Sequence, residues 1–286
     1  MIVLVVGATG SIGRLVVEEA IRQGFTVRAL VRDPAKARGL PSEARVIVGD
    51  VTRPETLADA VDGVGAIVFT LGSDGAGKVG AESVDYGGVR NVLRALGKRM
   101  ARIVLMTAIG VTNRTGAYNR ATEAHDWKRR SERLVRVSGL PYTIVRPGWF
   151  DYNRPDQHRL LLLQGDRRQS GDPSDGVVAR HQIAEVLVSS IISDHATRKT
   201  FELVATTGPA PNDFDALFAP LEPDPPGALD GVRDMPNMPL SDEPQRVRDD
   251  LNAVRAPQTR TRILERKGNP MRATVMYRAG DVRTPP

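Results

Sequence analysis

The chain has 286 residues, 41% of them hydrophobic and 26% charged, with a formal net charge of +6, and these values are ordinary for a globular protein. It contains no cysteine, which excludes disulfide bonds and thiolate chemistry. Its four histidines lack metal-ligand spacing, so no metal is expected. No run of about eighteen apolar residues occurs, and the start of the chain predicts a first strand rather than a signal peptide. We therefore expect no membrane span and a cytoplasmic location.

Short runs rich in Val and Ile alternate with longer amphipathic stretches as far as residue 205. The runs that predict strands are 2–7, 26–32, 44–50, 65–72, 102–108, 142–148 and 200–204. The stretches that predict helices are 14–24, 54–63, 84–98, 121–139 and 181–193. Strands alternating with helices indicate βαβ units with right-handed crossovers. The prediction is therefore an α/β fold with a Rossmann-type, doubly wound parallel sheet.

The composition changes near residue 220. Residues 220–244 hold seven prolines and predict an extended linker, followed by a short helix at 247–256 and a short strand at 273–279. Residues 222–250 carry eight acidic and three basic residues, whereas residues 251–286 form a basic arm. We accordingly divide the chain into a domain, 1–221, and a Pro-rich extension with a basic C-terminal arm, 222–286.

The charged extension predicts a docking role. Its acidic and basic halves could pair with each other, with the main domain, or with a second subunit in a homo-oligomer formed through the arm. The basic half contains one aromatic residue, Tyr277, and no recognised motif for reading bases, so nucleic acid is not an expected partner.

A glycine-rich loop, VVGATGSIGRLV, lies between the first strand and the first helix. In this arrangement Gly7 allows the tight turn, Gly10 lets the backbone approach a pyrophosphate, and Gly13 lets the helix pack against the sheet. The N–H groups at the helix start then face the phosphates. The other predicted contacts of the loop are Thr9, Ser11 and Ile12. Residues 1–221 are therefore predicted to be an NAD(P)-binding domain.

The end of the second strand bears on the choice of cofactor. An acidic residue there holds the ribose of NAD, whereas an arginine suits the 2′-phosphate of NADP. Arg32 comes first, Asp33 follows it, and Lys36 adds positive charge. NADP is therefore predicted, with NAD as the alternative, and Asp50 is expected to border the adenine. The remaining predicted cofactor contacts at the strand ends are Val51, Leu71 and Gly72.

Several segments resemble one known family. GATGSIG, LVRDPAKA, GDVTRPETLADAVDG, IVLMTAIGV and WKRRSERLVRVSGLPYTIVRPG are similar to the atypical short-chain dehydrogenase/reductases, specifically the NmrA-like, NAD(P)H-binding group that includes Tic62-like proteins. The resemblance covers roughly residues 1–220. It implies that Lys128 hydrogen-bonds the nicotinamide ribose, and that Pro147 and Gly148 border the nicotinamide and bind the cofactor.

The sequence departs from the family at the catalytic acid. The usual reductase pairs a Tyr with a Lys four residues later on one helix face, but Ala124 stands at the Tyr position and cannot pass a proton. Thr107 matches the family's active-site Ser and could polarise a substrate oxygen. Tyr118 precedes Ala124 by six residues and could swing in. Lys128, Thr107 and Tyr118 are therefore the candidate catalytic residues; His125 lies about 100° around the helix from Ala124.

Three functions stay open. The chain is either an NADP(H)-dependent oxidoreductase of a conjugated carbonyl or quinone-like acceptor, or a redox-sensing protein that binds NADP(H) and a regulatory protein partner. The third alternative is a nucleotide-sugar epimerase-like enzyme, which would need the same Tyr. The expected partner is accordingly a small-molecule substrate or a regulatory protein.

Overall fold

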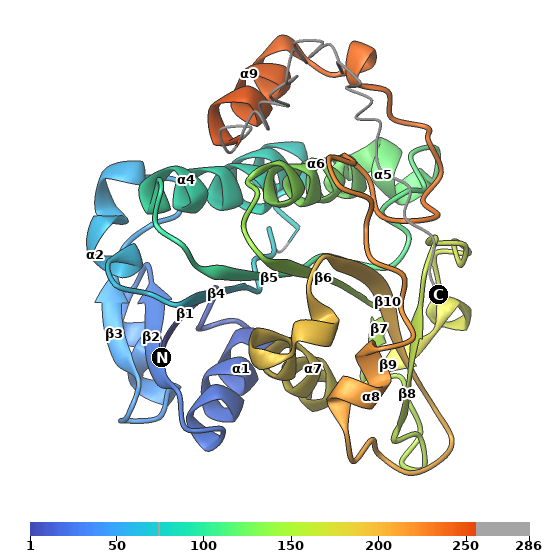
Figure 1. The fold of residues 1–286 in the computed structure, drawn as a ribbon, viewed down its shortest axis with the longest axis horizontal. Coiled ribbons are helices and arrows are strands. Elements are labelled where there is room, and N and C mark those ends of the chain that lie inside the picture. Colours follow the sequence, from blue (N-terminus) through green and yellow to red (C-terminus); the bar gives the residue numbers. More distant parts are fainter. Residues whose placement is uncertain (74, 256–286) are drawn as a thin grey trace, which may run out of the picture. The chain divides into compact units, whose positions relative to one another are not determined.

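The computed structural model describes residues 1–73 and 75–255, and all of these belong to one compact unit, Met1–Ala256. A parallel sheet runs through it in the order β3-β2-β1-β4-β5-β6-β10 (Figure 1). The strands are β1 (Ile2–Val6), β2 (Thr26–Val31), β3 (Arg45–Val48), β4 (Ala66–Phe69), β5 (Arg102–Met106), β6 (Tyr142–Pro147) and β10 (Lys199–Thr206). The strand order reverses between β1 and β4, the point where open α/β sheets bind ligands. The predicted doubly wound parallel sheet is confirmed.

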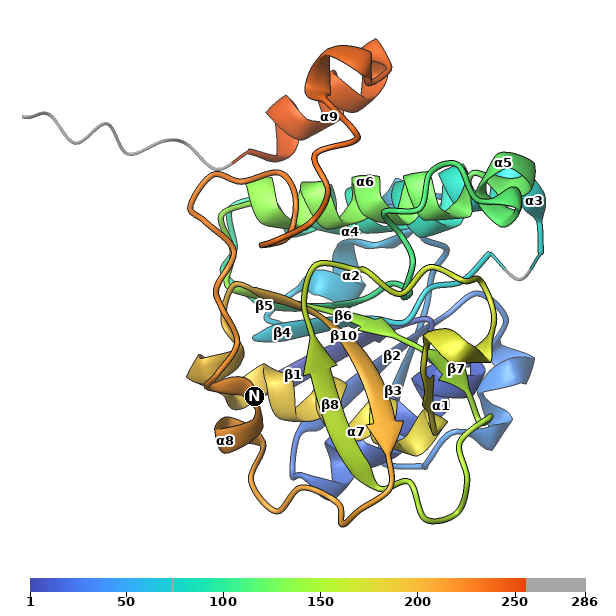
Figure 2. The same cartoon turned by 90° about the vertical axis from the view of Figure 1, so that its right-hand side faces the viewer.

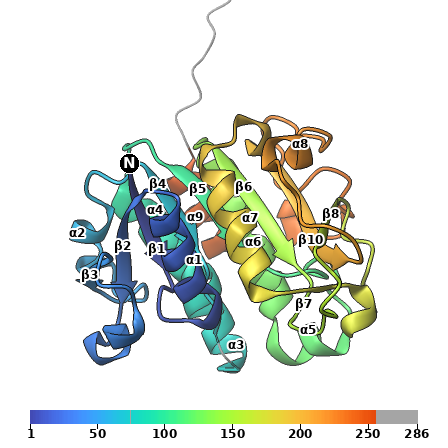
Figure 3. The same ribbon diagram turned by 90° about the horizontal axis from the view of Figure 1, so that it is seen from below.

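Helices cover both faces of the sheet. They are α1 (Ser11–Arg22) and α7 (Arg180–Ile192) on one face, and α2 (Ala58–Val61), α4 (Gly87–Leu96) and α6 (Ala124–Val137) on the other (Figures 1 and 3). In β1, Val3 and Val5 join the core cluster beneath α1 and α7, whereas Leu4 and Val6 join the cluster beneath α4 and α6. Because both faces of the strand are buried, its sequence is continuously apolar rather than alternating.

Three predicted helices are interrupted. The stretch 54–63 forms a 3-10 turn, Pro54–Thr56, and then α2. The stretch 84–98 begins in a π-helical turn, Ala81–Tyr86, before α4. Between α5 (Ala117–Thr122) and α6, Glu123 adopts a left-handed conformation with φ of 56°, which ends one helix and starts the other. The segment AHDWK consequently forms the first turn of α6.

Several short elements were not predicted from the sequence. These are α3 (Gly77–Gly80), α5, β7 (Trp149–Phe150), β8 (Arg159–Leu163), β9 (Val177–Val178) and α8 (Phe214–Phe218). Strands β8 and β9 pair antiparallel with β10, and β7 pairs with β9, so they extend the sheet beyond β10 (Figure 2). Two-residue strands are too short to show a periodic pattern, and the leucine run of β8 shows no alternation.

The predicted domain boundary after residue 221 falls inside the compact unit. Residues 222–244, which we call the acidic strap, pack on α6 instead of running free as a linker. Asp230 pairs with Arg129 and Arg133 at 3.0 and 2.8 Å, and Glu243 pairs with Arg133 at 2.8 Å. These ion pairs explain why the extension packs on the domain and does not form the predicted linker, because its acidic residues neutralise the arginines of α6.

The strap leads into α9 (Gln245–Val254), which confirms the short helix predicted at 247–256. Its Val247 and Leu251 are buried and belong to the same core cluster as residues of α4 and α6, with α9 on the outer side of these two helices (Figure 1). The predicted strand at 273–279 and most of the basic C-terminal arm lie outside the described residues.

Candidate functional site

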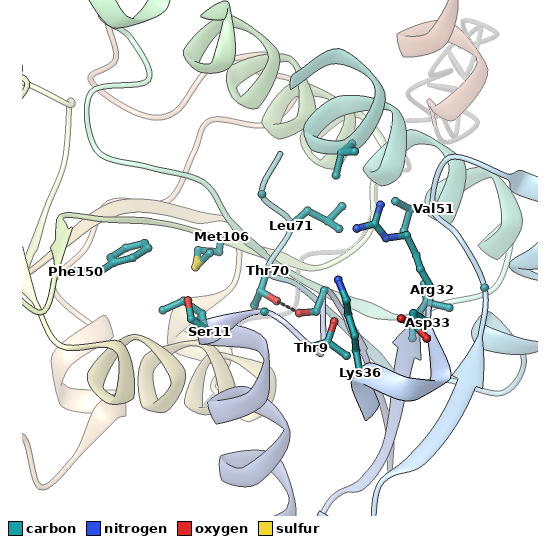
Figure 4. A pocket seen from close by; sticks show the side chains of 17 residues that line it. Thr9, Ser11, Arg32, Asp33, Lys36, Val51, Thr70, Leu71, Met106 and Phe150 are labelled. Carbon is teal, nitrogen blue, oxygen red and sulfur yellow. Dashed lines mark hydrogen bonds between the residues drawn. The ribbon is translucent and has the colours of Figure 1, made fainter. Parts of the chain in front are cut away.

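A cavity of about 510 Å³ lies at the carboxyl ends of β1 to β5, and we call it the first cavity (Figure 4). Its size lies within the range of small-molecule and cofactor sites. It contains nine of the predicted cofactor-binding residues: Gly7, Thr9, Gly10, Ser11, Ile12, Arg32, Val51, Leu71 and Gly72. Its other lining residues are Leu30, Asp33, Lys36, Gly49, Thr70, Val84, Met106 and Phe150. Apart from Asp33 and Lys36, which follow Arg32, and Gly49, which precedes Asp50, the sequence analysis did not single these out.

The three glycines of the loop have different structural roles. Gly7 has a φ of 92°, and a Cβ placed on it would lie 2.8 Å from the carbonyl oxygen of Thr70. A Cβ on Gly13 would lie 2.1 Å from the carbonyl oxygen of Gly7, so α1 could not approach the loop as closely. By contrast, a Cβ on Gly10 would meet only the Gly7 oxygen, at 3.2 Å. Gly7 and Gly13 are therefore needed for packing, whereas Gly10 keeps the cavity wall open beside the start of α1.

Positive charge gathers at one end of the first cavity. Arg32 and Lys36 extend toward it, while Met106 and Phe150 lie at the other end (Figure 4). The Asp33 carboxylate accepts the backbone N–H of Ala35 at 2.9 Å and so caps the 3-10 turn that follows β2. One oxygen of the acid at this position is thus used in a local hydrogen bond, and two cationic side chains, Arg32 and Lys36, line this end together with it.

Asp50 lies beside the first cavity without lining it, although its neighbours Gly49 and Val51 do. Its carboxylate accepts both the backbone N–H and the hydroxyl of Thr52, each at 2.8 Å. The predicted contact of Asp50 with the adenine would require the carboxylate to leave this turn or to share its second oxygen.

A second cavity, of about 420 Å³, adjoins the first, because Phe150 lines both. It is rich in aromatic side chains and contains the predicted residues Tyr118, Pro147 and Gly148. Its other lining residues are Ala108, Ile109, Gly110, Asn113, His125, Trp149, Gln169, Gly171 and Asp175. A Cβ on Gly148 would lie 2.4 Å from the carbonyl oxygen of Gly176, so close packing requires glycine at this position.

Tyr118 and His125 pack against each other in the wall of the second cavity, with ring centroids 5.1 Å apart and ring planes tilted by 57°. Burial lowers the pKa of His125, although the Asn113 backbone and nearby carboxylates oppose the shift. Its imidazole is therefore neutral at neutral pH. Among the described residues its Nδ1 atom is buried without a hydrogen-bond partner. The sequence analysis placed His125 on a different side of α6 from Ala124, and this rotation carries His125 into the cavity.

Lys128 and Thr107 line neither cavity. The Lys128 ammonium lies 3.0 Å from the carboxylate of Asp85, a buried residue of the π-helical turn, and Ser73 donates to the same carboxylate at 3.0 Å. Asp85 directly follows Val84, which lines the first cavity. The Thr107 hydroxyl donates to Glu132 at 2.8 Å. Of the three candidate catalytic residues, only Tyr118 therefore faces a cavity.

A buried ionic network holds α6 against the sheet. The carboxylate of Glu132 accepts from Arg146 at 2.9 and 2.7 Å and from Arg136 at 3.3 Å, and Arg146 also pairs with Asp234 of the acidic strap. Burial opposes ionisation of Glu132, but the arginine charges outweigh it and lower its pKa to about 2. Burial raises the pKa of the neighbouring Glu202 to about 8. The network fixes the helix that carries both His125 and Lys128.

Comparisons with known proteins agree with this geometry. The NAD(P)H-binding family matches residues 7–194. Rice protein TIC 62, chloroplastic, is 31% identical over 72% of this chain and 46% of its own length. Sanguinarine reductase from Eschscholzia californica is 27% identical over 76% of this chain and 94% of its own. The chain belongs to the NAD(P)H-binding family.

A solved structure described as a putative NAD-dependent epimerase/dehydratase from Bacillus halodurans superposes with a TM-score of 0.63 at 23% identity, covering 77% of this chain and 97% of that one. This likeness supports the fold. The chain spans about half the length of rice TIC 62. No helix within residues 1–73 and 75–255 is long and apolar enough to cross a membrane.

Proposed function

We propose that this chain is an NADP(H)-dependent oxidoreductase whose acceptor is a conjugated carbonyl or quinone-like molecule. The observation that carries the proposal is the pair of cavities joined at Phe150. The first cavity has the loop and helix start that suit a dinucleotide. The second lies beside the end of the first that Met106 and Phe150 line, where the nicotinamide would lie (Figure 4).

Arg32 and Lys36 support NADP as the cofactor. Both cationic side chains line the end of the cavity where the adenosine ribose would lie, and a 2′-phosphate there would accept charge-assisted hydrogen bonds. The Asp33 carboxylate, which would suit the ribose hydroxyl of NAD, already accepts the Ala35 N–H with one of its two oxygens. Replacing Arg32 tests this choice directly, as described in the Discussion.

The lining of the second cavity supports a flat, conjugated acceptor. Tyr118, His125, Trp149 and Phe150 offer aromatic faces for stacking, and Asn113 supplies a polar group for orientation. Bound NADPH would supply a hydride. The proton that follows it would come from the Tyr118 hydroxyl or from water. A conjugated acceptor needs little help from a protein acid, because the hydride leaves a stabilised anion, so it suits a site with Ala124 in place of the usual Tyr.

The test is NADPH oxidation with a panel of quinones and conjugated carbonyls, compared with simple unconjugated ketones. We expect turnover with the first group and not with the second. In Trp149→Ala the KM for the acceptor should rise while the Kd for NADPH stays constant, because Trp149 lines only the second cavity. Exposed Tyr152 packs edge-on against Trp149 outside the lining and gives a matched control, Tyr152→Ala. A larger effect of the control would contradict this site for the acceptor.

A second function is favoured by the position of Lys128. Its ammonium pairs with Asp85 and lines neither cavity, so the chain could bind NADP(H) as a redox sensor with a regulatory protein partner, without turnover. Tight NADPH binding with no oxidation across the panel would select this function. That one curated relative is named as a reductase supports the enzyme. The cytoplasmic location and the homo-oligomer remain predictions.

A further inference from the structure

Arg180, the first residue of α7, reaches the end of the glycine loop where α1 begins. Its Nε donates to the hydroxyl of Ser11 at 3.2 Å, and Ser11 is the first residue of α1. Its guanidinium also lies over the ring of Phe150, 5.4 Å from the centroid. Arg180 thus touches both the start of the helix that faces a pyrophosphate and the side chain shared by the two cavities.

The partner of Arg180 is Asp151, which directly follows β7 and has a φ of 59°. The Asp151 carboxylate accepts the backbone N–H of Arg180 at 3.0 Å, and it also forms an ion pair with the guanidinium. Both side chains are half-exposed, at 36% and 48%. Exposed ion pairs contribute little to stability, so the guanidinium can exchange this partner for another anion at small cost.

We propose that Arg180 binds the pyrophosphate of the dinucleotide, exchanging Asp151 for the phosphate oxygens. A guanidinium within hydrogen-bond distance of the Ser11 hydroxyl is within reach of an anion bound at the start of α1, and its planar fork matches phosphate oxygens. Among the described residues that line the first cavity, the cationic ones are Arg32 and Lys36, which lie at the end away from Ser11 (Figure 4). Arg180 supplies the positive charge that the Ser11 end of the loop lacks.

The proposal predicts that replacing Arg180 and replacing Asp151 change the affinity for ligands with a pyrophosphate in opposite directions. Arg180→Gln removes the charge at the phosphates, so ligands with a pyrophosphate should bind about tenfold more weakly, the usual effect of one charge-assisted hydrogen bond. Asp151→Asn keeps an acceptor for the Arg180 N–H but frees the guanidinium. The same ligands should therefore bind roughly a few-fold more tightly, because the Asp151 carboxylate no longer competes with the phosphate oxygens for the guanidinium.

Calorimetry with NADP, 2′-phospho-ADP-ribose and 2′-AMP separates the ends of the site, since only the first two carry a pyrophosphate. R180Q should weaken the first two and leave 2′-AMP unchanged. Arg154→Gln removes an exposed arginine that pairs with Asp156 and should change none of the three. ADP-ribose and adenosine form a parallel set without the 2′-phosphate, so a chain that prefers NAD would still give a clear result.

Equal weakening of 2′-AMP and NADP in R180Q would overturn the proposal, as would no weakening at all. Weaker binding in D151N than in the wild type would show that the pair acts structurally instead. The Tm without ligand is measured for each variant. If R180Q unfolds, Arg180→Lys keeps the charge without the fork, and it should lose part of the affinity for NADP while binding 2′-AMP as the wild type does.

Discussion

The carboxylate of Glu132 lies at the centre of the network beneath α6, and replacing it with Gln tests how that helix is held. The substitution keeps the size of the side chain but removes the negative charge between Arg146 and Arg136. Leaving a buried charge without its partner costs about 3–5 kcal/mol. Because Arg146 keeps Asp234 and Arg136 keeps Asp224, we expect the lower end of this range.

The lowered pKa of Glu132 predicts how the effect depends on pH. A decrease from 4.5 to about 2 corresponds to about 3 kcal/mol of stability at neutral pH. Since the pKa is lower in the folded protein, this stability is present above about pH 4.5 and is lost as the pH falls toward 2. The difference between wild type and Glu132→Gln should therefore be greatest near neutral pH and shrink as the pH is lowered through this range.

Thermal unfolding followed by circular dichroism measures the effect. A loss of about 3 kcal/mol should lower the Tm by roughly 6–12 °C in a domain of this size. Glu55→Gln is a matched control, since Glu55 forms an exposed ion pair with Arg53, and it should leave the Tm unchanged. If Glu132→Gln unfolds at the temperature of the wild type, or equally early at every pH, the network does not hold α6 as described.

Four further changes have distinct expected results. Arg32→Ala should weaken NADP binding by roughly 1.5–3 kcal/mol and leave NAD nearly unchanged, and equal losses in calorimetry would contradict a 2′-phosphate contact. Gly10→Val should abolish binding of either cofactor while the circular dichroism spectrum stays native; normal binding would mean that the loop is only structural. Ala124 is buried in the core, so the larger side chain of Ala124→Tyr should lower the free energy of unfolding in urea by about 1–3 kcal/mol. We expect this variant to have no ketone reductase activity. A stable variant that gains the activity would show that this face of the helix is open. Ending the chain after Leu221 removes the acids that neutralise the arginines of α6, so little soluble folded protein is expected; a truncated protein with the wild-type Tm would mean that the strap is passive.

The sequence was sufficient for the parts of the site that depend on local pattern. The loop from Gly7 to Gly13 lies where an apolar strand meets an amphipathic helix, and this context predicts its glycines, although the atoms that a Cβ on Gly7 would meet belong to the distant Thr70. Arg32 could be placed because it follows a strand whose end must lie at the sheet's ligand-binding edge.

The parts that escaped prediction depend on contacts between distant segments. The partners of Arg133 are Asp230 and Glu243, about a hundred residues away, so the arginine-rich stretch of α6 could equally have been a solvated face. Phe150 lies in a two-residue strand, too short for any periodicity, and its place between two cavities follows from pairing with β9. Asp85, the partner of Lys128, lies in a π-helical turn that sequence periodicity does not distinguish from α4.

Hydride transfer itself tests the central claim most directly. The protein is incubated with NADPH carrying deuterium at the transferable position of the nicotinamide and with a conjugated enone, and the product is examined by mass spectrometry. We predict that the reduced product carries deuterium on carbon, that the rate shows a primary isotope effect, and that Trp149→Ala lowers the yield while the Kd for NADPH is unchanged. Tight binding of NADPH with no deuterium transferred to enones and no NADPH oxidised by quinones would contradict the assignment as an oxidoreductase.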